Sequence, residues 1–334
     1  MQATFLAGRR GINNVIIAQE LIYSLKKRKG GDGYMVVKID LEKAYDRLEL
    51  SFVRMVLKHF GFPANIINLI MSCISSTSTD VLFNGNKLDS FQPTRGIKQG
   101  DPISPYIFLL CIEFLGDQIN SMCENKRWDT IKASKNGPSF SHVFFADDFM
   151  LFAKANTKNS EAIMEVLDNF CTLASQKVNL AKSKVLFSPN VARRCKRSIR
   201  KKLEINAIQN LGRYLGFPLI YKGRNGDAFN FVIDRVQKKL SGWHTKFLSK
   251  ARKMVLAKIA AALIVEYYMQ CHALPVKVCE AIDKLIRDFL WGSTAENRKM
   301  HMVNWSTITL PKDRGGLNLY QMQYRNQAIL AKLC

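Results

Sequence analysis

Phe144-Phe145-Ala146-Asp147-Asp148-Phe149-Met150-Leu151-Phe152 places two adjacent carboxylates inside an apolar, aromatic-rich run. The apolar residues on both sides predict two short buried strands, with the acidic pair at the tight turn that joins them. Neighbouring ionised carboxylates repel each other and resist burial, so a chain that places them there normally supplies a compensating cation. Carboxylate oxygens suit a hard ion such as Mg²⁺, which also binds substrate phosphates. The alternative interpretation is a polar hairpin tip between two core strands.

A third carboxylate ends another predicted strand. The β-rich segment Tyr34-Met35-Val36-Val37-Lys38-Ile39 is followed directly by Asp40, and sites in α/β folds tend to lie at the carboxyl ends of strands. Further on, residues 95–105 form a glycine-punctuated loop that leads into an apolar helix predicted at 106–122. Backbone N–H groups at such a helix start are available to a phosphate or a base. Taken alone, this segment is also an ordinary entry from loop to helix.

The remaining pattern predicts mainly helices. Apolar residues at helical spacing mark helices at 15–25, 49–59, 64–75 and 160–173, and three more succeed one another between residues 228 and 290. An Asn84-Gly85 pair predicts a hairpin turn, and residues 185–187 read as a strand. A polar, glycine-containing stretch at residues 221–227 predicts a domain boundary.

The charge is strongly basic and unevenly distributed. The 334 residues carry a formal net charge of +23, with 47% hydrophobic residues, so the chain is folded and not a disordered tail. Residues 1–190 carry a net +5 and residues 191–334 a net +18. A surplus confined to one part is typical of a surface that binds a polyanion. The alternative is a solvated basic face that serves solubility.

The cysteines and the apolar runs place the protein in a reducing compartment. Eight cysteines are scattered without a CxxC pair, which favours reduced thiols. No apolar run approaches the length of a membrane span, and the start of the chain lacks the layout of a secretion signal. We therefore expect a nuclear or cytoplasmic protein that is not secreted and does not bind a membrane.

The order of these pieces resembles the palm of a reverse transcriptase. More closely, it resembles the LINE-type (non-LTR) retrotransposon reverse transcriptases of plant genomes. A strand ending in an aspartate, a Gln-Gly loop, an acidic hairpin and a lysine-bearing loop follow one another as in that family. The matched segments are motif A at 40–45, motif B at 95–105, motif C at 145–148, motif D at 179–183 and motif E at 214–219.

The resemblance implies an α+β fold. It consists of a reverse-transcriptase palm, in which helices pack on an antiparallel sheet, with partial fingers and a helical thumb. The expected domains are partial fingers at 1–31, the palm at 32–222, a basic thumb at 223–300 and the start of a C-terminal connection region at 301–334. Because Met1 falls inside the fingers, we expect a fragment that lacks the start of the fingers and the endonuclease.

The resemblance also implies an RNA-directed DNA polymerase that works by two-metal nucleotidyl transfer. Charge develops on the attacking 3′-oxygen and on the departing pyrophosphate, and two Mg²⁺ ions, or Mn²⁺ in their place, stabilise both. Asp40 and Asp147 would bridge the ions, and Asp148 would assist. Lys182 would lie by the leaving pyrophosphate as a proton donor. The alternative for Lys182 is an ordinary exposed loop lysine.

Other residues take binding roles by the same resemblance. Arg9 would meet the triphosphate, Tyr45 would lie under the incoming sugar, and Gln99 and Gly100 would touch the nascent pair and the template. For Tyr45 the alternative is a core aromatic. The implied partners are an RNA template, a DNA primer and deoxynucleoside triphosphates. The residues expected to bind nucleic acid are Arg95, Arg193, Arg194, Arg197, Lys238 and Lys239.

Three departures from the family's pattern stand out. Gly11 and Asn13 occupy positions where Ile and Asp are usual, and motif C begins with Phe145 where Tyr is commoner. Ala174-Ser175 replaces a Ser-Gly pair before motif D. If the second position of that pair takes a positive φ, Ser175 strains the turn that leads to motif D.

Two rival functions remain. The first is a catalytically inactive nucleic-acid-binding remnant of such an element, and the second is a maturase-like RNA-binding protein. The intact set Asp40, Asp147 and Asp148 argues against long decay, while the missing fingers argue for it. Primer extension on an RNA template separates the enzyme from the remnant.

Overall fold

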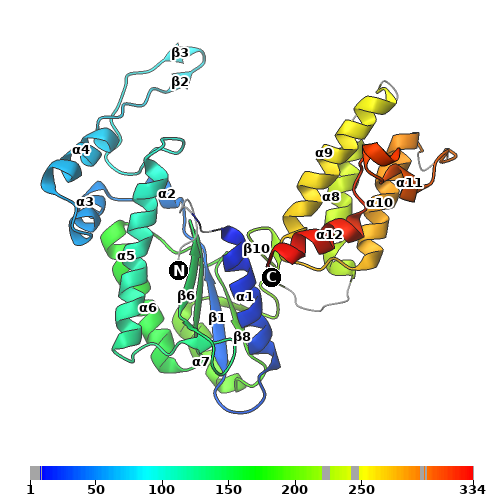
Figure 1. Cartoon of the computed structure of the whole chain (residues 1–334). Helices are drawn as coiled ribbons and strands as arrows, with labels where there is room; N and C mark the ends of the chain where they lie inside the picture. The colour runs from blue at the N-terminus through cyan, green and yellow to red at the C-terminus, as the bar shows by residue number, and fades with distance from the viewer. Residues whose placement is uncertain are drawn as a thin grey trace. The chain divides into compact units, whose positions relative to one another are not determined.

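The computed structural model describes residues 8, 10–219, 226–241, 248–293, 297 and 299–333 (Figure 1). The chain divides into two compact units, residues 1–219 and 220–334, and each is described by itself. The domain boundary predicted at 221–227 falls next to this division, although residues 221–225 lie outside the described part of the chain. The other expected domain limits remain predictions.

The first unit is built on a five-stranded sheet with the order β6-β7-β1-β8-β9. β1 lies at the centre, antiparallel to β7 and to β8, and β6 pairs antiparallel with β7, as predicted. β9 differs: helix α7 joins it to β8 as a crossover connection, and these two strands run parallel. The strands are β1 (Tyr34–Ile39), β6 (His142–Phe145), β7 (Asp148–Lys154), β8 (Lys184–Phe187) and β9 (Asn206–Ile208).

The helices predicted in the first unit are present. Each expected helix is found within a few residues of its predicted ends, whereas the basic run at residues 193–203 was not predicted as a helix. Pro105 lies in the first turn of α5, where its missing N–H is tolerated. The helices are α1 (Gly11–Lys27), α2 (Ala44–Arg47), α3 (Leu50–His59), α4 (Ala64–Ser75), α5 (Ser104–Glu124), α6 (Thr157–Ala174) and α7 (Arg193–Leu203).

Different helices cover the two faces of the sheet (Figure 1). Met35, Val37 and Ile39 of β1 belong to one buried apolar cluster that also contains residues of α3, α5, α6 and α7. We call this face of the sheet the helical face. The alternating residue Val36 is equally buried and points to the opposite face, along which α1 lies. The strand Tyr34–Ile39, predicted as buried, is therefore covered on both sides.

Three short hairpins complete the first unit. The predicted Asn84-Gly85 turn joins β2 (Leu82–Phe83) to β3 (Asn86–Lys87), with φ of 49° at Asn84 and 83° at Gly85. The motif E segment at residues 214–219 lies in the hairpin of β10 (Arg213–Tyr214) and β11 (Phe217–Pro218). A third hairpin, β4 (Ile131–Lys132) and β5 (Ser139–Phe140), was not predicted, because its strands are only two residues long.

The second unit is helical, as predicted. Its helices in the described part of the chain are α8 (Asn230–Ser241), α9 (Lys250–Met269), α10 (Val276–Trp291), α11 (Trp305–Ile308) and α12 (Met322–Leu330). The α12 residue Asn326 ties two neighbouring segments together: its amide accepts from the N–H of Leu274 and donates to the carbonyl of His272. An Arg325–Glu266 ion pair joins α12 to α9. These bonds hold the bundle as one unit.

The seven cysteines in the described part of the chain are free thiols, as expected, and Cys73 is exposed. No described helix combines the length and the apolar character that crossing a membrane requires.

Candidate active site

Two of the three predicted carboxylates end neighbouring strands. In the pairing of β1 with β7, Ile39 lies opposite Phe149, so Asp40 follows β1 beside Asp148, the first residue of β7. Phe145 pairs with Asp148 across the hairpin, which leaves Ala146 and Asp147 as the turn. Ala146 takes φ of 50°, in the left-handed region. The predicted tight turn between two buried strands is confirmed.

The carboxylates lie within electrostatic reach of one another. Burial against the surrounding protein, followed by the negative charges of Asp148 and Asp40, raises the pKa of Asp147 above its ordinary value. Burial and the charge of Asp147 raise the pKa of the Tyr45 phenol. Asp147 is nevertheless exposed at the tip of its turn. The structure therefore brings Asp40, Asp147, Asp148 and Tyr45 together at one edge of the sheet.

Lys38 is a further member of this site that the sequence interpretation missed. Its ammonium group lies 3.2 Å from a carboxylate oxygen of Asp148 and 3.4 Å from the carbonyl oxygen of Arg213, to which it donates. A signal for it was present: a lysine inside a buried strand, two residues before Asp40, has to share the face of the strand on which Asp40 lies.

The motif D loop holds the backbone of Asp40 from both sides. The N–H of Asp40 donates to the hydroxyl of Ser183 at 3.1 Å, and its carbonyl accepts from the N–H of Asn179 at 2.8 Å. The backbone N–H of Lys182 donates to the side chain of Asn179 at 3.1 Å. The Lys182 side chain is exposed, so the loop is anchored at Asp40 while its lysine stays accessible to solvent.

The motif B loop docks on the residues that follow Asp40. The N–H of Ile97 donates to the carbonyl of Tyr45, and the N–H of Gly96 to that of Leu48. A Cβ at Gly96 would lie 2.8 Å from the carbonyl oxygen of Asp46, so only glycine fits this approach. The Tyr45 ring stacks on Phe108 of α5, with centroids 4.5 Å apart. Tyr45 is thus packed against the core and at the same time faces the charge of Asp147.

The remaining motif B residues are placed on the surface of this loop. Arg95, Gln99 and Gly100 are exposed, and Gly100 takes φ of 94°. The side chain of Asp101 accepts from the N–H of Ile103, two residues further on, and so forms a turn just before α5. The loop therefore presents Gln99 and Gly100 to solvent on a base fixed by Gly96 and Ile97.

The motif E hairpin and α1 close the face on which Asp148 lies. Tyr214 is fully buried, and its burial, followed by the charge of Asp148, raises the pKa of its phenol. Gln19 of α1 donates to the carbonyl of Pro218. Gly11 meets the ring of Phe145, and a Cβ there would lie 2.6 Å from the Cε2 atom of that ring. The two unusual residues Gly11 and Phe145 are therefore packed against each other.

Several predicted binding residues are not brought to the carboxylates. Arg9 lies outside the described residues. Arg193, Arg194 and Arg197 belong to α7, which packs on the helical face, whereas Asp148 and Lys38 lie on the other face. Lys238 and Lys239 are exposed on α8 of the second unit. Their proposed contact with nucleic acid stays a prediction.

The donor set suits a divalent metal ion. Burial, and then the charges of the two neighbouring carboxylates, raise the pKa of Asp147, and oxygen ligands of this kind fit Mg²⁺. As the side chains stand, no group of three Asp, Glu, His or Cys residues in the described ranges lies close enough together to hold an ion. Asp148 is paired with Lys38 instead. Asp40, Asp147 and Asp148 remain the residues that would bind it.

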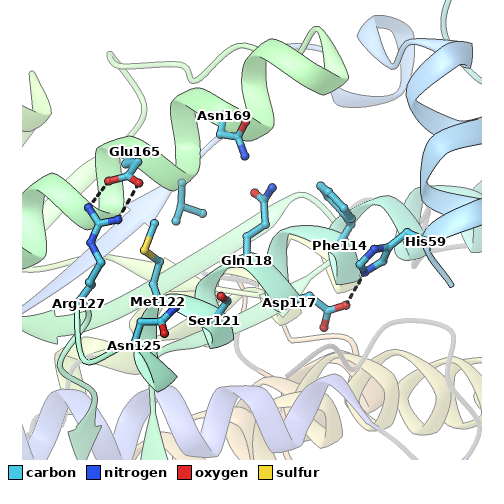
Figure 2. Close-up of a pocket in the computed structure, with 11 residues that line it drawn as sticks. His59, Phe114, Asp117, Gln118, Ser121, Met122, Asn125, Arg127, Glu165 and Asn169 are labelled. Atoms are coloured by element: carbon cyan, nitrogen blue, oxygen red, sulfur yellow. Dashed lines mark hydrogen bonds and ion pairs between the residues drawn. The ribbon is translucent and has the colours of Figure 1, made fainter.

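A separate hollow lies on the helical face (Figure 2). An ion pair between Arg127, which follows α5, and Glu165 of α6 lies on one side of it, and His59 contacts Asp117 on the other. None of the predicted site residues lines this hollow. It is therefore not part of the carboxylate site.

Nearly all of the first unit matches a known protein family. Residues 8–219 match the family model described as reverse transcriptase (RNA-dependent DNA polymerase). A retrovirus-related Pol polyprotein from a type-1 retrotransposable element R2 of Popillia japonica is 24% identical over 327 residues, which are 96% of this chain and 51% of that protein. An uncharacterized 149 kDa protein of transposon TX1 from Xenopus laevis is 24% identical over 94% of this chain and 23% of its own length.

The chain thus spans about half the length, or less, of these two relatives. Over a shorter stretch of 67 residues, 20% of this chain and 55% of that protein, it is 42% identical to an uncharacterized mitochondrial protein of Arabidopsis thaliana. Among solved structures, a telomerase from Candida albicans covers 88% of this chain and 52% of its own, with a TM-score of 0.46 and 13% identity.

Proposed function

This chain belongs to the reverse transcriptase (RNA-dependent DNA polymerase) family, and on that premise we propose that it extends a DNA primer on an RNA template as part of a non-LTR retrotransposon. The observation that supports this activity best is that Asp40, Asp147 and Asp148 lie near one another at the end of β1 and the start of β7. Of the two relatives that match nearly the whole chain, one is named as a protein of a retrotransposable element and the other as a protein of a transposon.

In this proposal the carboxylates work on an in-line phosphoryl transfer. Asp40 and Asp147 would hold two Mg²⁺ ions, which supply positive charge to the attacking 3′-oxygen and to the departing pyrophosphate. Lys38 neutralises Asp148 and fixes its position. Asn179 and Ser183 hold the backbone of Asp40 and so set the direction of its side chain.

The other predicted residues would bind the substrates. Tyr45, held by its stacking on Phe108, would support the sugar of the incoming nucleotide. Gln99 and Gly100 would contact the nascent base pair from the exposed loop. Lys182, accessible next to the anchor of Asp40, would donate a proton to the pyrophosphate. Arg9 would bind the triphosphate.

Phosphate contacts of the basic residues would give most of the affinity for the primer–template. Arg95 in the first unit and Lys238 and Lys239 in the second are exposed and so accessible for this role. We further propose that the protein works in the nucleus or the cytoplasm.

Primer extension tests the proposal. Purified protein with Mg²⁺ and deoxynucleoside triphosphates should extend a DNA primer annealed to RNA, and Asp147→Ala should abolish the product. Asp168→Ala removes a carboxylate from the exposed surface of α6 and serves as the matched control, which should extend normally. Binding of the primer–template without extension by the unaltered chain would instead support the inactive remnant.

A further inference from the structure

Helix α7 carries basic side chains that the carboxylate site does not use. Six of them are exposed, and at 3.6 residues per turn five of these fall within about one third of the helix circumference. Ile199 and Leu203 lie on the other side of the helix and are buried. We call these five residues the basic stripe: Arg193, Arg194, Arg197, Arg200 and Lys201.

The basic stripe and the carboxylates belong to opposite faces of the sheet. Ile199 and Leu203 share one apolar cluster with Val37 of β1. Asp148 and Lys38 pair with each other on the face that alternates with this cluster. Nucleic acid held at the carboxylates and a ligand held by the basic stripe would therefore occupy different sides of the first unit.

The stability of the helix does not account for the basic stripe. Arg193 and Arg194 stand in the first turn of α7, which contains no acidic residue, although the positive end of the helix dipole favours acidic residues there. Arg193 and Arg197, and Arg197 and Lys201, are like charges four residues apart, which destabilise a helix. A bound polyanion would remove both kinds of repulsion.

Partners within the protein do not account for it either. Lys202, which points away from the basic stripe, forms an ion pair with Glu161 of α6. Throughout the described ranges, no ion pair joins a residue of the basic stripe to a carboxylate. The charge of the basic stripe thus faces solvent.

The surface beside the basic stripe is hollowed. Arg197, Arg200 and Lys201 line a hollow together with Glu204, Ile205 and Asn206, so three cations and one carboxylate border it. From residue 193 to residue 201 a helix rises about 12 Å, so the basic stripe is long enough to contact more than one phosphate of a strand. Guanidinium groups bind phosphate oxygens through paired N–H donors.

We propose that the basic stripe binds the sugar–phosphate backbone of a nucleic acid strand that extends beyond the carboxylate site. The strand is the polymerase's own RNA template or DNA primer, so this identification of the ligand rests on the proposed function. The binding step itself needs neither metal nor nucleotide. The long strand would then be held on the helical face while its end is copied on the other face.

The test compares three substrates in a binding assay with the full chain carrying Asp147→Ala, without nucleotides. The first is a short primer–template, the second has a long single-stranded RNA extension of the template, and the third has a long DNA extension of the primer. The protein with the unaltered basic stripe should bind at least one extended substrate more tightly than the short one. The extension that raises the affinity shows whether the basic stripe binds the RNA template or the DNA primer.

The triple variant Arg193→Ala, Arg197→Ala, Arg200→Ala should lose this gain and bind the short substrate normally. At about 0.7 per phosphate, the slope of log K against log salt for the extended RNA should fall by about 2. Between 50 and 200 mM salt the parent protein should therefore lose roughly twentyfold more affinity than the variant. The same three positions changed to lysine should keep most of the slope.

The control removes three equal charges elsewhere: Lys58→Ala, Lys135→Ala, Lys202→Ala, all exposed outside the basic stripe. It should bind the extended substrates like the parent. Unchanged binding by the arginine variant, or an equal loss in the control, would overturn the proposal. If circular dichroism shows that the triple variant is unfolded, the single change Arg197→Ala decides, with an expected fall in slope of about 0.7. Because all arms measure binding alone, a chain that cannot extend primers still tests the basic stripe.

Discussion

Asp147 combines exposure to solvent with a raised pKa, because the protein surrounds one side of it and two carboxylates stand near. Its folded pKa lies above the unfolded one, so ionisation of Asp147 favours the unfolded chain. The stability that the neutral carboxyl contributes is complete at low pH and is lost as the pH rises through the folded pKa. At neutral pH the ionised Asp147 therefore lowers the free energy of unfolding.

We expect Asp147→Asn to make the protein more stable than the parent at pH 7 and to leave it nearly unchanged at pH 4. Thermal unfolding at the two pH values measures the difference. Mg²⁺ should raise the unfolding temperature of the parent and leave that of the variant in place. A variant that is less stable than the parent at pH 7 would contradict the electrostatic explanation.

His142 predicts a second pH effect of opposite sign. Burial next to α5 lowers the pKa of its imidazole to about 3, and the ring stacks on Phe144 at 4.4 Å. Protonation thus favours the unfolded chain: the stability is complete above pH 6.5, the unfolded value, and is lost as the pH falls toward the folded value. Between pH 6.5 and 5 the loss should be about 2 kcal/mol.

Urea unfolding at these two pH values tests this effect, with His142→Phe as the comparison. Phenylalanine keeps an aromatic ring against Phe144 but cannot titrate, so this part of the pH dependence should vanish. An equal slope with pH in both proteins would show that other groups cause it.

At the scale of elements, the turn after α6 carries backbone strain. Ser175 takes φ of 54° and ψ of 26°, where a side chain is disfavoured, and its carbonyl accepts from Arg47. The sequence predicted strain in this turn if Ser175 takes a positive φ, and the structure shows that it does. Ser175→Gly should raise the free energy of unfolding by about 1 kcal/mol.

The neighbouring change gives the control for this prediction. Ala174 is the last residue of α6 and is fully buried, so Ala174→Gly should lower the free energy of unfolding by about 1 kcal/mol. Chemical unfolding of both variants measures the two signs. A loss of stability with Ser175→Gly would mean that the serine makes a contact worth more than the strain.

The elements themselves could largely be predicted, because apolar spacing alone marks β1 and the long helices. Helix α7 could not, since seven basic residues in ten conceal the two buried positions Ile199 and Leu203. The parallel course of β9 depends on that unpredicted helix. At the site, the sequence motifs predicted the three carboxylates. The pairing of Lys38 with Asp148 depends on the strand register, which cannot be read from a single sequence.

At the scale of the whole molecule, both units are basic, with a net charge of +12 on residues 1–219 and +11 on residues 220–334. The net +18 of residues 191–334 includes α7 of the first unit and all of the second unit. A change at Lys238 and Lys239 on α8 therefore probes the second unit alone. If this unit binds the primer–template, its phosphate contacts should control affinity and leave the chemistry at the carboxylates unchanged.

Lys238→Ala with Lys239→Ala should weaken binding of a short primer–template and lower the salt slope by about 1 to 2. The rate of a single nucleotide addition at saturating substrate should stay the same. Arginine at both positions should restore the affinity, since it keeps the charge. A reduced single-turnover rate at saturation would place these lysines in the chemistry instead.

The ion pair between Lys38 and Asp148 has a consequence for how this protein is made. The ammonium group of Lys38 already offsets the negative charge of Asp148, so the palm can fold in cells before Mg²⁺ binds. Chelation with EDTA should then stop primer extension but leave the protein folded, unlike a zinc finger, which unfolds when its ion is removed. In the variant Lys38→Met, folding should become dependent on Mg²⁺.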